Sequence, residues 1–324
     1  MYSISNLQQL ITRAIAQQKY PVNPSELYEP ISYLMNLGGK RLRPALLLMA
    51  TDLFKGDVEK AIKPALAIEV FHNFTLMHDD IMDKAPLRRG NPTVHAKWNE
   101  AVAILSGDVM LVEAYKLIMQ VKPAILPDIL KIFNDTAVGV CEGQQIDMNF
   151  ENYQEVKVDE YINMIRLKTA VLLGGALKIG ALIGEATEND AELLYDFGEK
   201  LGIAFQLQDD ILDVYGDPEK FGKQVGGDII SNKKTFLLIR ALELAQGAQK
   251  EELQNWLNKT NFNTQEKVAA VTAIYNSLNI QEIAKKEMES YAAKGLASLN
   301  KIAVDEERKS VLREFADMLM LRDN

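Results

Sequence analysis

Three aspartates with the spacing DDxxD occur twice in this sequence and are the residues best suited to chemistry. They are Asp79, Asp80 and Asp83 in the first cluster and Asp209, Asp210 and Asp213 in the second. If each segment is helical, residues four apart share a face, so the outer aspartates of a cluster point the same way. Carboxylates held this close repel one another, and Mg²⁺, which takes oxygen ligands together with substrate phosphates, relieves the repulsion. The pattern predicts a diphosphate held through Mg²⁺ between two acidic helices.

Both clusters lie next to helix-stop signals. The segment Lys84-Ala85-Pro86 follows the first cluster, and Tyr215-Gly216-Asp217-Pro218 follows the second. Each cluster is therefore expected near a helix C-terminus, where the helix macrodipole disfavours negative charge. A single cluster could be a solvated acidic helix end. Two matched clusters in the same unfavourable position favour a functional reason.

A diphosphate also requires positive charge from the protein, and several basic segments are candidates. Residues 38–44 read GGKRLRP and put three cations on a glycine-rich turn before an expected helix that would begin at Pro44. Arg88 and Arg89 follow the first acidic cluster, where they either bind phosphate or offset the aspartates. Three further lysines are weaker candidates when taken singly: Lys168, Lys223 and Lys233.

Helical periodicity dominates the elements that must position these residues, and strand signals are nearly absent, so we predict an all-α fold. The expected helices are 5–18, 24–37, 44–55, 58–83, 94–120, 124–150, 158–184, 188–215, 228–247, 249–258, 263–277, 281–300 and 305–321. On the 58–83 helix, His72 and Thr75 share a face with the outer aspartates. On the 188–215 helix, Gln206 shares a face with the second cluster. Polar faces on such apolar helices are expected to line a cavity.

Composition bounds the remaining possibilities. The chain has 324 residues, of which 48% are apolar and 25% charged, and it contains no linker-like stretch, so we expect a single domain over 1–324. A net charge of −9 without a basic block argues against nucleic-acid binding on electrostatic grounds. The only cysteine is Cys141, which suits the cytoplasm, and no secretory signal or membrane-spanning run is evident.

The ordered set of motifs resembles the trans-isoprenyl diphosphate synthases, the polyprenyl synthetase family that includes farnesyl and geranylgeranyl diphosphate synthases. The matching segments are GGKRLRP at 38–44, DDIMD at 79–83, RRG at 88–90, GQQID at 143–147, KT at 168–169, QLQDDILD at 206–213, and the stretch from FGKQVGGD to NKKT at 221–235. The resemblance implies an all-α fold around a deep central cavity, usually in a homodimer.

The resemblance also implies roles for individual residues. About three Mg²⁺ would be held by the two aspartate clusters and would bridge an allylic diphosphate. The same diphosphate would contact Arg88, Lys168, Lys223 and Lys233. Isopentenyl diphosphate would be held by Lys40, Arg43, His72 and Arg89. Thr169 and Gln206 would flank the reacting allylic carbon, whereas the roles of Gln144 and Asp147 are left open.

Charge stabilisation would drive the chemistry that this resemblance implies. Metal ions and cations stabilise the leaving diphosphate, the allylic C–O bond ionises, and the double bond of isopentenyl diphosphate attacks the cation. Loss of a proton leaves a product five carbons longer. No protein nucleophile is needed, and we interpret His78 and His95 as structural.

Bulk below the first DDxxD is expected to set the product length. Phe74 lies five residues before Asp79 and Thr75 lies four before, and the motif carries no insertion, as in geranylgeranyl-type enzymes. On an ideal helix Phe74 is turned about 100° from Thr75, and Phe71 lies about 12 Å deeper than Asp79. Either aromatic could form the floor. We expect a C20 product first and C15 second.

Three other functions fit parts of the pattern. A class I terpene cyclase shares the ionisation step but needs no second diphosphate site, and it would replace the second DDxxD with a mixed metal motif. A non-catalytic subunit that modulates a partner synthase should have lost one acidic cluster or the cations. A head-to-head condensing enzyme is a weaker third possibility.

Overall fold

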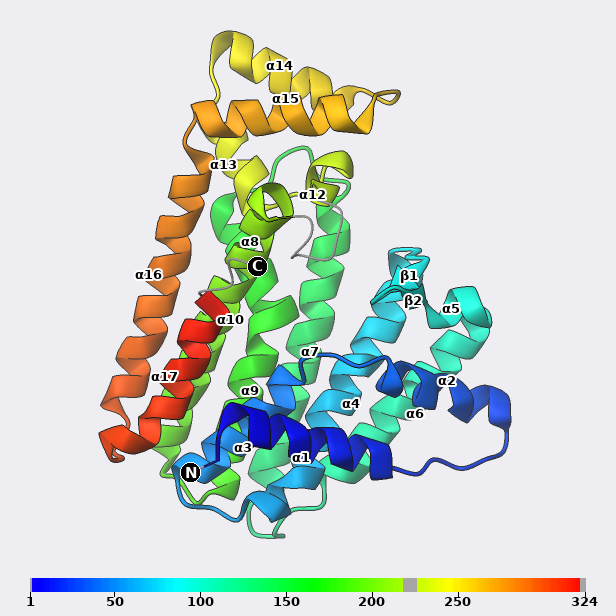
Figure 1. Ribbon diagram of the computed structural model, residues 1–324, viewed down its shortest axis with the longest axis vertical. Helices are drawn as coiled ribbons and strands as arrows, with labels where there is room; N and C mark the ends of the chain where they lie inside the picture. The colour runs from blue at the N-terminus through cyan, green and yellow to red at the C-terminus, as the bar shows by residue number, and fades with distance from the viewer. Residues whose placement is uncertain (1, 218–225, 321–324) are drawn as a thin grey trace. The chain divides into compact units, whose positions relative to one another are not determined.

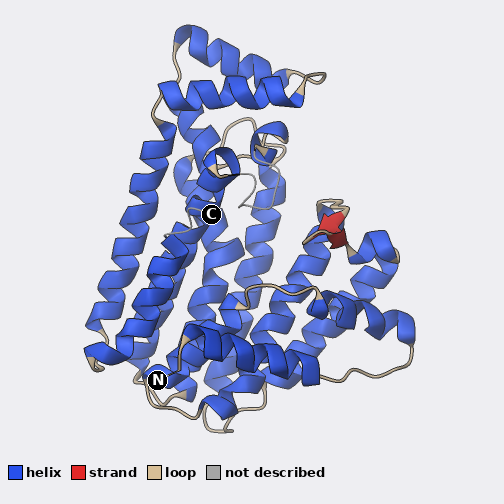
Figure 2. Cartoon of the chain, in the orientation of Figure 1, coloured by secondary structure: helices blue, strands red, loops and turns tan. Residues whose placement is uncertain are grey.

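The computed structural model describes residues 2–217 and 226–320, and its regular structure is almost entirely helical (Figure 2). The all-α prediction is confirmed. Within the described residues the only strands are β1 (Leu87–Arg88) and β2 (Asn91–Pro92), which form a short antiparallel hairpin with Arg88 opposite Asn91. This segment lies between the predicted helices 58–83 and 94–120, and two residues per strand are too short to give an alternating pattern.

The chain divides into two compact units that interleave along the sequence. Unit 1 comprises Met1–Asn134, Gly175–Tyr195 and Ala303–Val311, and unit 2 comprises Asp135–Gly174, Asp196–Ile302 and Leu312–Asn324. Four helices contribute residues to both units: α7 (Leu126–Phe150), α9 (Val171–Ile183), α10 (Glu188–Tyr215) and α17 (Glu306–Met320). The expectation of a single domain over 1–324 stays a prediction.

Unit 1 is built around one long buried helix. Its own helices are α1 (Ile4–Gln17), α2 (Ser25–Asn36), α3 (Leu42–Leu53), α4 (Val58–Met82), α5 (Val94–Lys97) and α6 (Glu100–Ile118). The long helix α4 packs against α3 and α6 (Figure 1). Its contact with α6 is close, because a Cβ atom added at Gly107 would come within 2.2 Å of His78 Nε2. A helix that is buried on most sides gives the rigid support that a site at its end requires.

Unit 2 surrounds the C-terminal half of α10. Its remaining elements are α8 (Val158–Ile165), the π-helix η1 (Arg166–Ala170), α12 (Gly227–Ile230), α13 (Phe236–Leu244), α14 (Gly247–Asn258), α15 (Thr264–Ser277) and α16 (Ile280–Lys301). Figure 1 shows α14 and α15 lying side by side. The core gathers apolar side chains from these elements, with Leu207 and Ile211 of α10 fully or almost fully buried among them.

Two predicted helices are broken where a side chain caps the start of a new helix. The 94–120 helix breaks because the Asn99 side chain accepts a hydrogen bond from Val102 N at 2.9 Å and starts α6 afresh. The 228–247 helix breaks before Thr235, which caps α13 through a bond from Leu238 N at 3.4 Å. Lys233 therefore lies between helices. The last predicted helix, 305–321, ends at Met320, the last residue described.

Two further differences concern backbone geometry near the predicted site. The helix predicted to begin at Pro44 begins at Leu42, with Arg41 as its N-cap. Pro44 still falls in the first turn, where its missing N–H would be unpaired in any case. The predicted 158–184 helix is interrupted by η1, a turn that is one residue wider than an α-turn.

Of the described helices, none combines the length and the apolar character needed to cross a membrane.

Candidate functional site

The first acidic cluster lies at the C-terminal end of α4, as predicted. Asp83 is the C-cap residue and is exposed, and Asp79 one turn earlier is half-buried. Asp80 differs from both, since the residue is only 2% exposed. The opposite end of the same helix begins with Asp57, whose carboxylate accepts from Glu59 N at 3.2 Å in the position that suits a negative charge. The two ends of α4 therefore carry aspartates in opposite electrostatic situations.

Arg88 forms a salt bridge with Asp80, the buried carboxylate of this cluster. Its Nε donates to Asp80 Oδ2 at 2.8 Å and its Nη2 donates to Asp80 Oδ1 at 2.7 Å, a two-pronged contact. The hairpin holds Arg88 in place, because Thr93 Oγ1 closes the loop by donating to Ala85 O at 2.7 Å. Asp80 is thus oriented by protein, and the half-buried and exposed Asp79 and Asp83 are the members better placed to take a metal ion.

His72 lies in a strongly positive environment within unit 1. Burial lowers the pKa of His72 well below its usual value, and the charges of Arg43, Arg89, Arg88 and Arg41 lower it further. Arg43 Nη1 lies 3.2 Å from His72 Nε2. Because arginine can only donate, Nε2 accepts this bond and the imidazole is neutral. Clustered guanidinium groups around a neutral histidine favour an anionic ligand.

The glycine-rich turn before α3 is fixed by hydrogen bonds from two side chains distant in sequence. Gln8 Nε2 donates to Lys40 O at 2.6 Å, and Arg89 donates to Gly38 O. Gly39 has a φ of +129°, and a Cβ atom there would lie 2.9 Å from the guanidinium carbon of Arg89. The backbone angle therefore favours glycine at this position, and the Arg89 guanidinium fills the space beside it. The turn presents Lys40 exposed at the surface.

The aromatic residues proposed to limit the product form a contiguous cluster. The Phe71 ring lies 5.7 Å from that of Phe74 and 5.4 Å from that of Phe133, between ring centroids. Phe74 in turn packs edge-on against His78 at 4.8 Å. Both phenylalanines are buried, whereas Thr75 is half-buried and donates to His72 O at 2.8 Å. Such interlocked rings suit a wall that is hard to displace.

The second acidic cluster repeats the arrangement of the first. The side chain of its middle residue, Asp210, is buried, with the residue as a whole 4% exposed, and its carboxylate accepts a hydrogen bond from the Tyr161 hydroxyl. Gln206 Nε2 also donates to Asp210 at 3.4 Å, as expected from their shared face. Burial raises the pKa of Asp210 to about 7, and the nearby charge of Asp228 contributes to the rise. Asp209 is half-buried, so again the neighbour of the buried aspartate is the better metal ligand.

Asp213 links the end of α10 to the start of α12. Its carboxylate accepts from Asp228 N at 3.0 Å, and its backbone carbonyl accepts from Gly226 N at 2.6 Å. The side chain therefore also holds the start of α12, in addition to any role with a metal. Lys233, exposed beyond α12, lies near enough to Asp210 to act on its titration. Lys223 lies outside the described residues.

Lys168 and Thr169 lie on the wide turn η1 rather than on a regular helix. Lys168 Nζ donates to Asp147 at 2.6 Å, and Thr169 Oγ1 donates to Gln206 Oε1 at 3.4 Å. The backbones of α7 and α10 both pack closely against this turn. A Cβ atom at Gly143 would come within 2.2 Å of Lys168 N, and one at Gly202 within 2.6 Å of Ala170 Cα. The GQQID segment therefore supplies both the room for the turn and, through Asp147, the partner that orients Lys168.

Sequence reasoning missed the residues that orient the site rather than form it. Tyr161 is an ordinary core aromatic by pattern, and Arg41 does not stand out from the two cations beside it. The structure makes Tyr161 the donor to Asp210 and pairs Arg41 Nη1 with Glu69 Oε1 at 2.5 Å. A charged residue at an apolar position of α4 was the available signal for Glu69.

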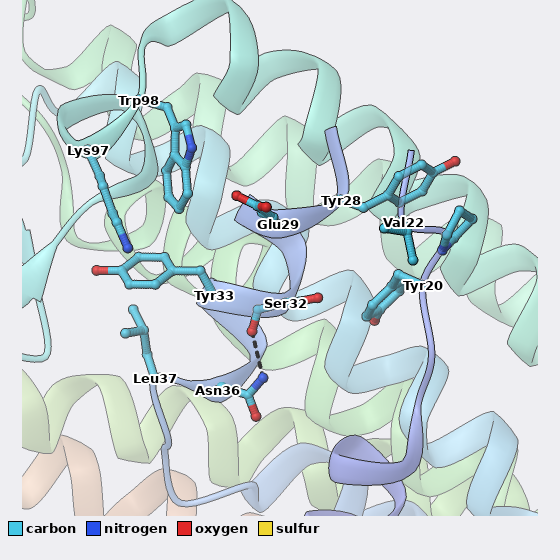
Figure 3. Close-up of a pocket in the computed structure, with 11 residues that line it drawn as sticks. Tyr20, Val22, Tyr28, Glu29, Ser32, Tyr33, Asn36, Leu37, Lys97 and Trp98 are labelled. Carbon is cyan, nitrogen blue, oxygen red and sulfur yellow. Dashed lines mark hydrogen bonds between the residues drawn. The ribbon is translucent and has the colours of Figure 1, made fainter. Parts of the chain in front are cut away.

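A separate cavity of about 610 Å³ lies on unit 1 between the segment around Tyr20, helix α2 and helix α5 (Figure 3). Lys97 Nζ lies 3.8 Å from the ring centroid of Tyr33 and 4.6 Å from that of Trp98. The cavity contains none of the motif residues. Its cation–π contacts join α5 to α2 and so contribute to packing.

The carboxylates present fit Mg²⁺ by their chemistry. Among the described residues, no three acidic, histidine or cysteine side chains already form a complete metal site. Mg²⁺ does not require one, because it takes one or two carboxylates and completes its shell with water and substrate phosphates. Two aspartates one turn apart at the end of α4, and Asp209 on α10, meet that requirement.

Comparison with known proteins shows which family this chain resembles. The family profile described as polyprenyl synthetase matches residues 24–275. A short chain isoprenyl diphosphate synthase of Methanocaldococcus jannaschii is 38% identical over 304 residues, covering 94% of this chain and 91% of its own length. A geranylgeranyl diphosphate synthase of Methanosarcina mazei is 36% identical over 322 residues, covering 99% of this chain and 97% of its own.

A solved structure shows the same similarity in three dimensions. The crystal structure of a geranylgeranyl pyrophosphate synthase superposes with a TM-score of 0.95 at 42% sequence identity, and the match covers 100% of both chains.

Proposed function

Because this chain belongs to the polyprenyl synthetase family, we propose that it is a short-chain prenyltransferase that joins isopentenyl diphosphate to an allylic diphosphate of five to fifteen carbons. The observation that carries the proposal is the pairing, within unit 1, of an acidic helix end with a cluster of arginines around a neutral His72. One feature suits a metal-bound diphosphate and the other suits a diphosphate bound directly by cations.

We propose that the arginine cluster holds isopentenyl diphosphate. Positive charge comes from Lys40, Arg43 and Arg89. His72 supplies an uncharged hydrogen-bonding group beside them. Arg43 is already oriented by its contact with His72 Nε2 at 3.2 Å. Arg89 donates to Gly38 O and is thereby held next to the turn that carries Lys40.

We propose that the allylic diphosphate binds through Mg²⁺ to Asp79 and Asp83 of α4 and to Asp209 and Asp213 of α10. Asp80 and Asp210 orient these ends through Arg88 and Tyr161, although each retains oxygen lone pairs that could reach a metal ion. Bound Mg²⁺ would neutralise charge that develops on the leaving diphosphate. Further positive charge on that diphosphate would come from Arg88, Lys168, Lys223 and Lys233.

Different protein groups then assist different steps of the reaction. Cations around the leaving diphosphate favour ionisation of the allylic C–O bond. Thr169 and Gln206, joined by a hydrogen bond of 3.4 Å, present oxygen dipoles that favour the developing carbocation. The double bond of isopentenyl diphosphate attacks this cation, and loss of a proton, taken up by the departing diphosphate, gives a product five carbons longer. No protein nucleophile takes part.

The alternatives are less well supported. A cyclase would not require the arginine cluster around His72, and a silent subunit would not require both intact acidic ends. The relatives cited above are synthases by name, which favours chain elongation over cyclisation or head-to-head condensation.

A product assay with and without metal tests the proposal. The purified protein is incubated with labelled isopentenyl diphosphate and each of the C5, C10 and C15 allylic diphosphates, with Mg²⁺ or with excess chelator. We expect C20 as the main product and loss of at least about 99% of turnover when the metal is removed, because the diphosphate would leave without charge neutralisation. Absence of elongation from every starter by a folded protein would rule the proposal out. Hydrocarbon release without isopentenyl diphosphate would instead identify a cyclase.

We further propose that two copies associate through α6. Ile104, Leu105, Val112 and Met119 at its end are all exposed, and on a helix they fall within an arc of about 100°. The other face of α6 packs on α4, so this helix is apolar on both sides, as expected of a helix that is covered on both. A self-complementary contact across a two-fold axis would bury the stripe.

Sedimentation of charged variants tests this association. Leu105→Glu and Val112→Glu are expected to convert a dimer to a monomer, since each would bury an unpaired charge. Val22→Glu, at an even more exposed apolar residue outside α6, is expected to leave the dimer intact. A monomeric native protein, or dimers in all three variants, would refute the α6 interface.

A further inference from the structure

Arg41 is turned inward, unlike the two cations beside it in the sequence. Lys40 is exposed and Arg43 half-buried, whereas Arg41 is 8% exposed. A guanidinium that could bind phosphate is thus withdrawn from the surface at the centre of the basic turn. Burial of a charge is costly unless it is matched, so its partners show what it does.

The partners of Arg41 join three segments of unit 1. Its Nη1 donates to Glu69 Oε1 of α4 at 2.5 Å, and its Nη2 donates to Met35 O at the end of α2 at 2.6 Å. Glu69 is itself 2% exposed and is held by Asn73 Nδ2, which donates to its Oε1 at 3.0 Å. Glu69 lies one turn before His72 on α4, so the anchor and the proposed substrate-binding histidine share one rigid element.

The backbone at Arg41 is strained in a way that the buried pair compensates. Arg41 adopts φ +50° and ψ +38°, the left-handed region, which costs a residue with a Cβ atom about 1 kcal/mol or more. Such a conformation persists where surrounding contacts over-determine it. Here it turns the chain sharply between Lys40 and the first turn of α3, and it places Arg43 within 3.2 Å of His72.

We propose that Arg41 and Glu69 are positioning residues for the isopentenyl diphosphate site, with no direct contact to the substrate. Their buried ion pair fixes the start of α3 against α4, so that Lys40 and Arg43 stand beside His72 before the substrate arrives. This assignment rests on the function proposed above.

Stability alone does not explain a buried pair of this kind. Replacing a buried ion pair by apolar side chains of similar volume is often neutral or stabilising, so its value lies in the geometry it specifies. Two donors of one planar group reach Glu69 and Met35 O together, and a lysine ammonium, which acts as a point charge, does not reproduce that fork. The pair therefore determines the direction of the turn as well as holding it.

The test compares two arginines that anchor opposite ends of α3. Arg41→Met removes the anchor at the N-terminal end, and Arg41→Lys keeps the charge but loses the fork. Arg308→Met is the matched control, since Arg308 Nε donates to Leu53 O at 2.7 Å, at the C-terminal end of the same helix and away from the basic turn. For each variant, KM is measured separately for isopentenyl diphosphate and for the allylic diphosphate, together with kcat and the melting temperature.

Arg41→Met is expected to raise KM for isopentenyl diphosphate by about tenfold or more, because small misplacements of binding groups have effects of this size, while KM for the allylic diphosphate changes less than about twofold. Arg41→Lys should fall between Arg41→Met and the native protein. Arg308→Met should lower the melting temperature without changing either KM. Equal changes in both KM values for Arg41→Met, or the same KM change in Arg308→Met, would overturn the assignment and leave Arg41 a purely structural residue.

Calorimetric titration with isopentenyl diphosphate separates this inference from the proposed function. A native protein that binds it, with affinity reduced in Arg41→Met, supports the positioning role even where turnover is not detected. A native protein that binds it with the same affinity as Arg41→Met refutes the positioning role and leaves the proposed function standing. A native protein that does not bind it refutes both.

Discussion

Replacing Asp79 or Asp209 by alanine is expected to lower kcat by about 1,000-fold while the protein stays folded. Each carboxylate is proposed to hold a metal ion that stabilises the leaving diphosphate, and removal of one charge-stabilising group at a reacting centre costs this much in other enzymes. Both lie near the C-terminal end of a helix, where negative charge is unfavourable. Their removal should therefore leave the melting temperature unchanged or slightly raised.

Asp57 provides the matched control for Asp79. It caps the N-terminal end of α4, so Asp57→Ala should cost about 1 kcal/mol of stability and leave turnover intact. Opposite outcomes at the two ends of one helix would show that the acidic C-terminal end serves a ligand. If Asp79→Ala unfolds the protein, or if it retains native turnover, the proposed metal role is wrong.

Enlarging the space below the first acidic cluster is expected to lengthen the product. Phe74→Ala should shift the main product from C20 to C25, and the combined change of Phe74 and Phe71 to alanine should extend it further. Phe71 lies about 12 Å along α4 from Asp79, and both rings belong to one interlocked cluster. Removal of a ring leaves a cavity that a longer isoprenoid tail can occupy.

Chromatography of the chain lengths measures this effect, with thermal unfolding measured in parallel. Buried phenylalanine-to-alanine changes cost about 3–5 kcal/mol, so Phe74→Leu is included as a milder variant that should shift the products partly. Phe54→Ala, at the far end of α3 from Arg43, is the control and should leave the product distribution unchanged. Native products from a folded double variant would place the floor elsewhere.

The elements that carry the predicted site could be foreseen because their signals are long or repeated. The α4 and α10 helices end within one residue of their predicted bounds, since both stop signals follow long apolar runs. The contact of Gln206 with Asp210 also followed from helical spacing alone. A spacing of four residues was enough to identify which side chains share a face.

Contacts between segments distant in sequence could not be foreseen. Asp80 and Asp210 are spaced like their neighbours, yet each is buried against a partner, Arg88 or Tyr161, that only the folded chain brings near. The inward turn of Arg41 likewise depends on Glu69, 28 residues away. Local spacing predicts which face a side chain occupies, and tertiary packing decides what covers that face.

The wide turn η1 allows one stretch of chain to contact two neighbouring helices. Tyr161 and Lys168 are seven residues apart, and in an unbroken α-helix seven residues span about 700°, so both would point to the same side. The wide turn changes this phase. Tyr161 reaches Asp210 on α10, and Lys168 reaches Asp147 on α7. Winding 166–170 as a regular helix of the same length would bring Tyr161 and Lys168 back to one side, so the wide turn is what allows one stretch of chain to contact α10 and α7 at once.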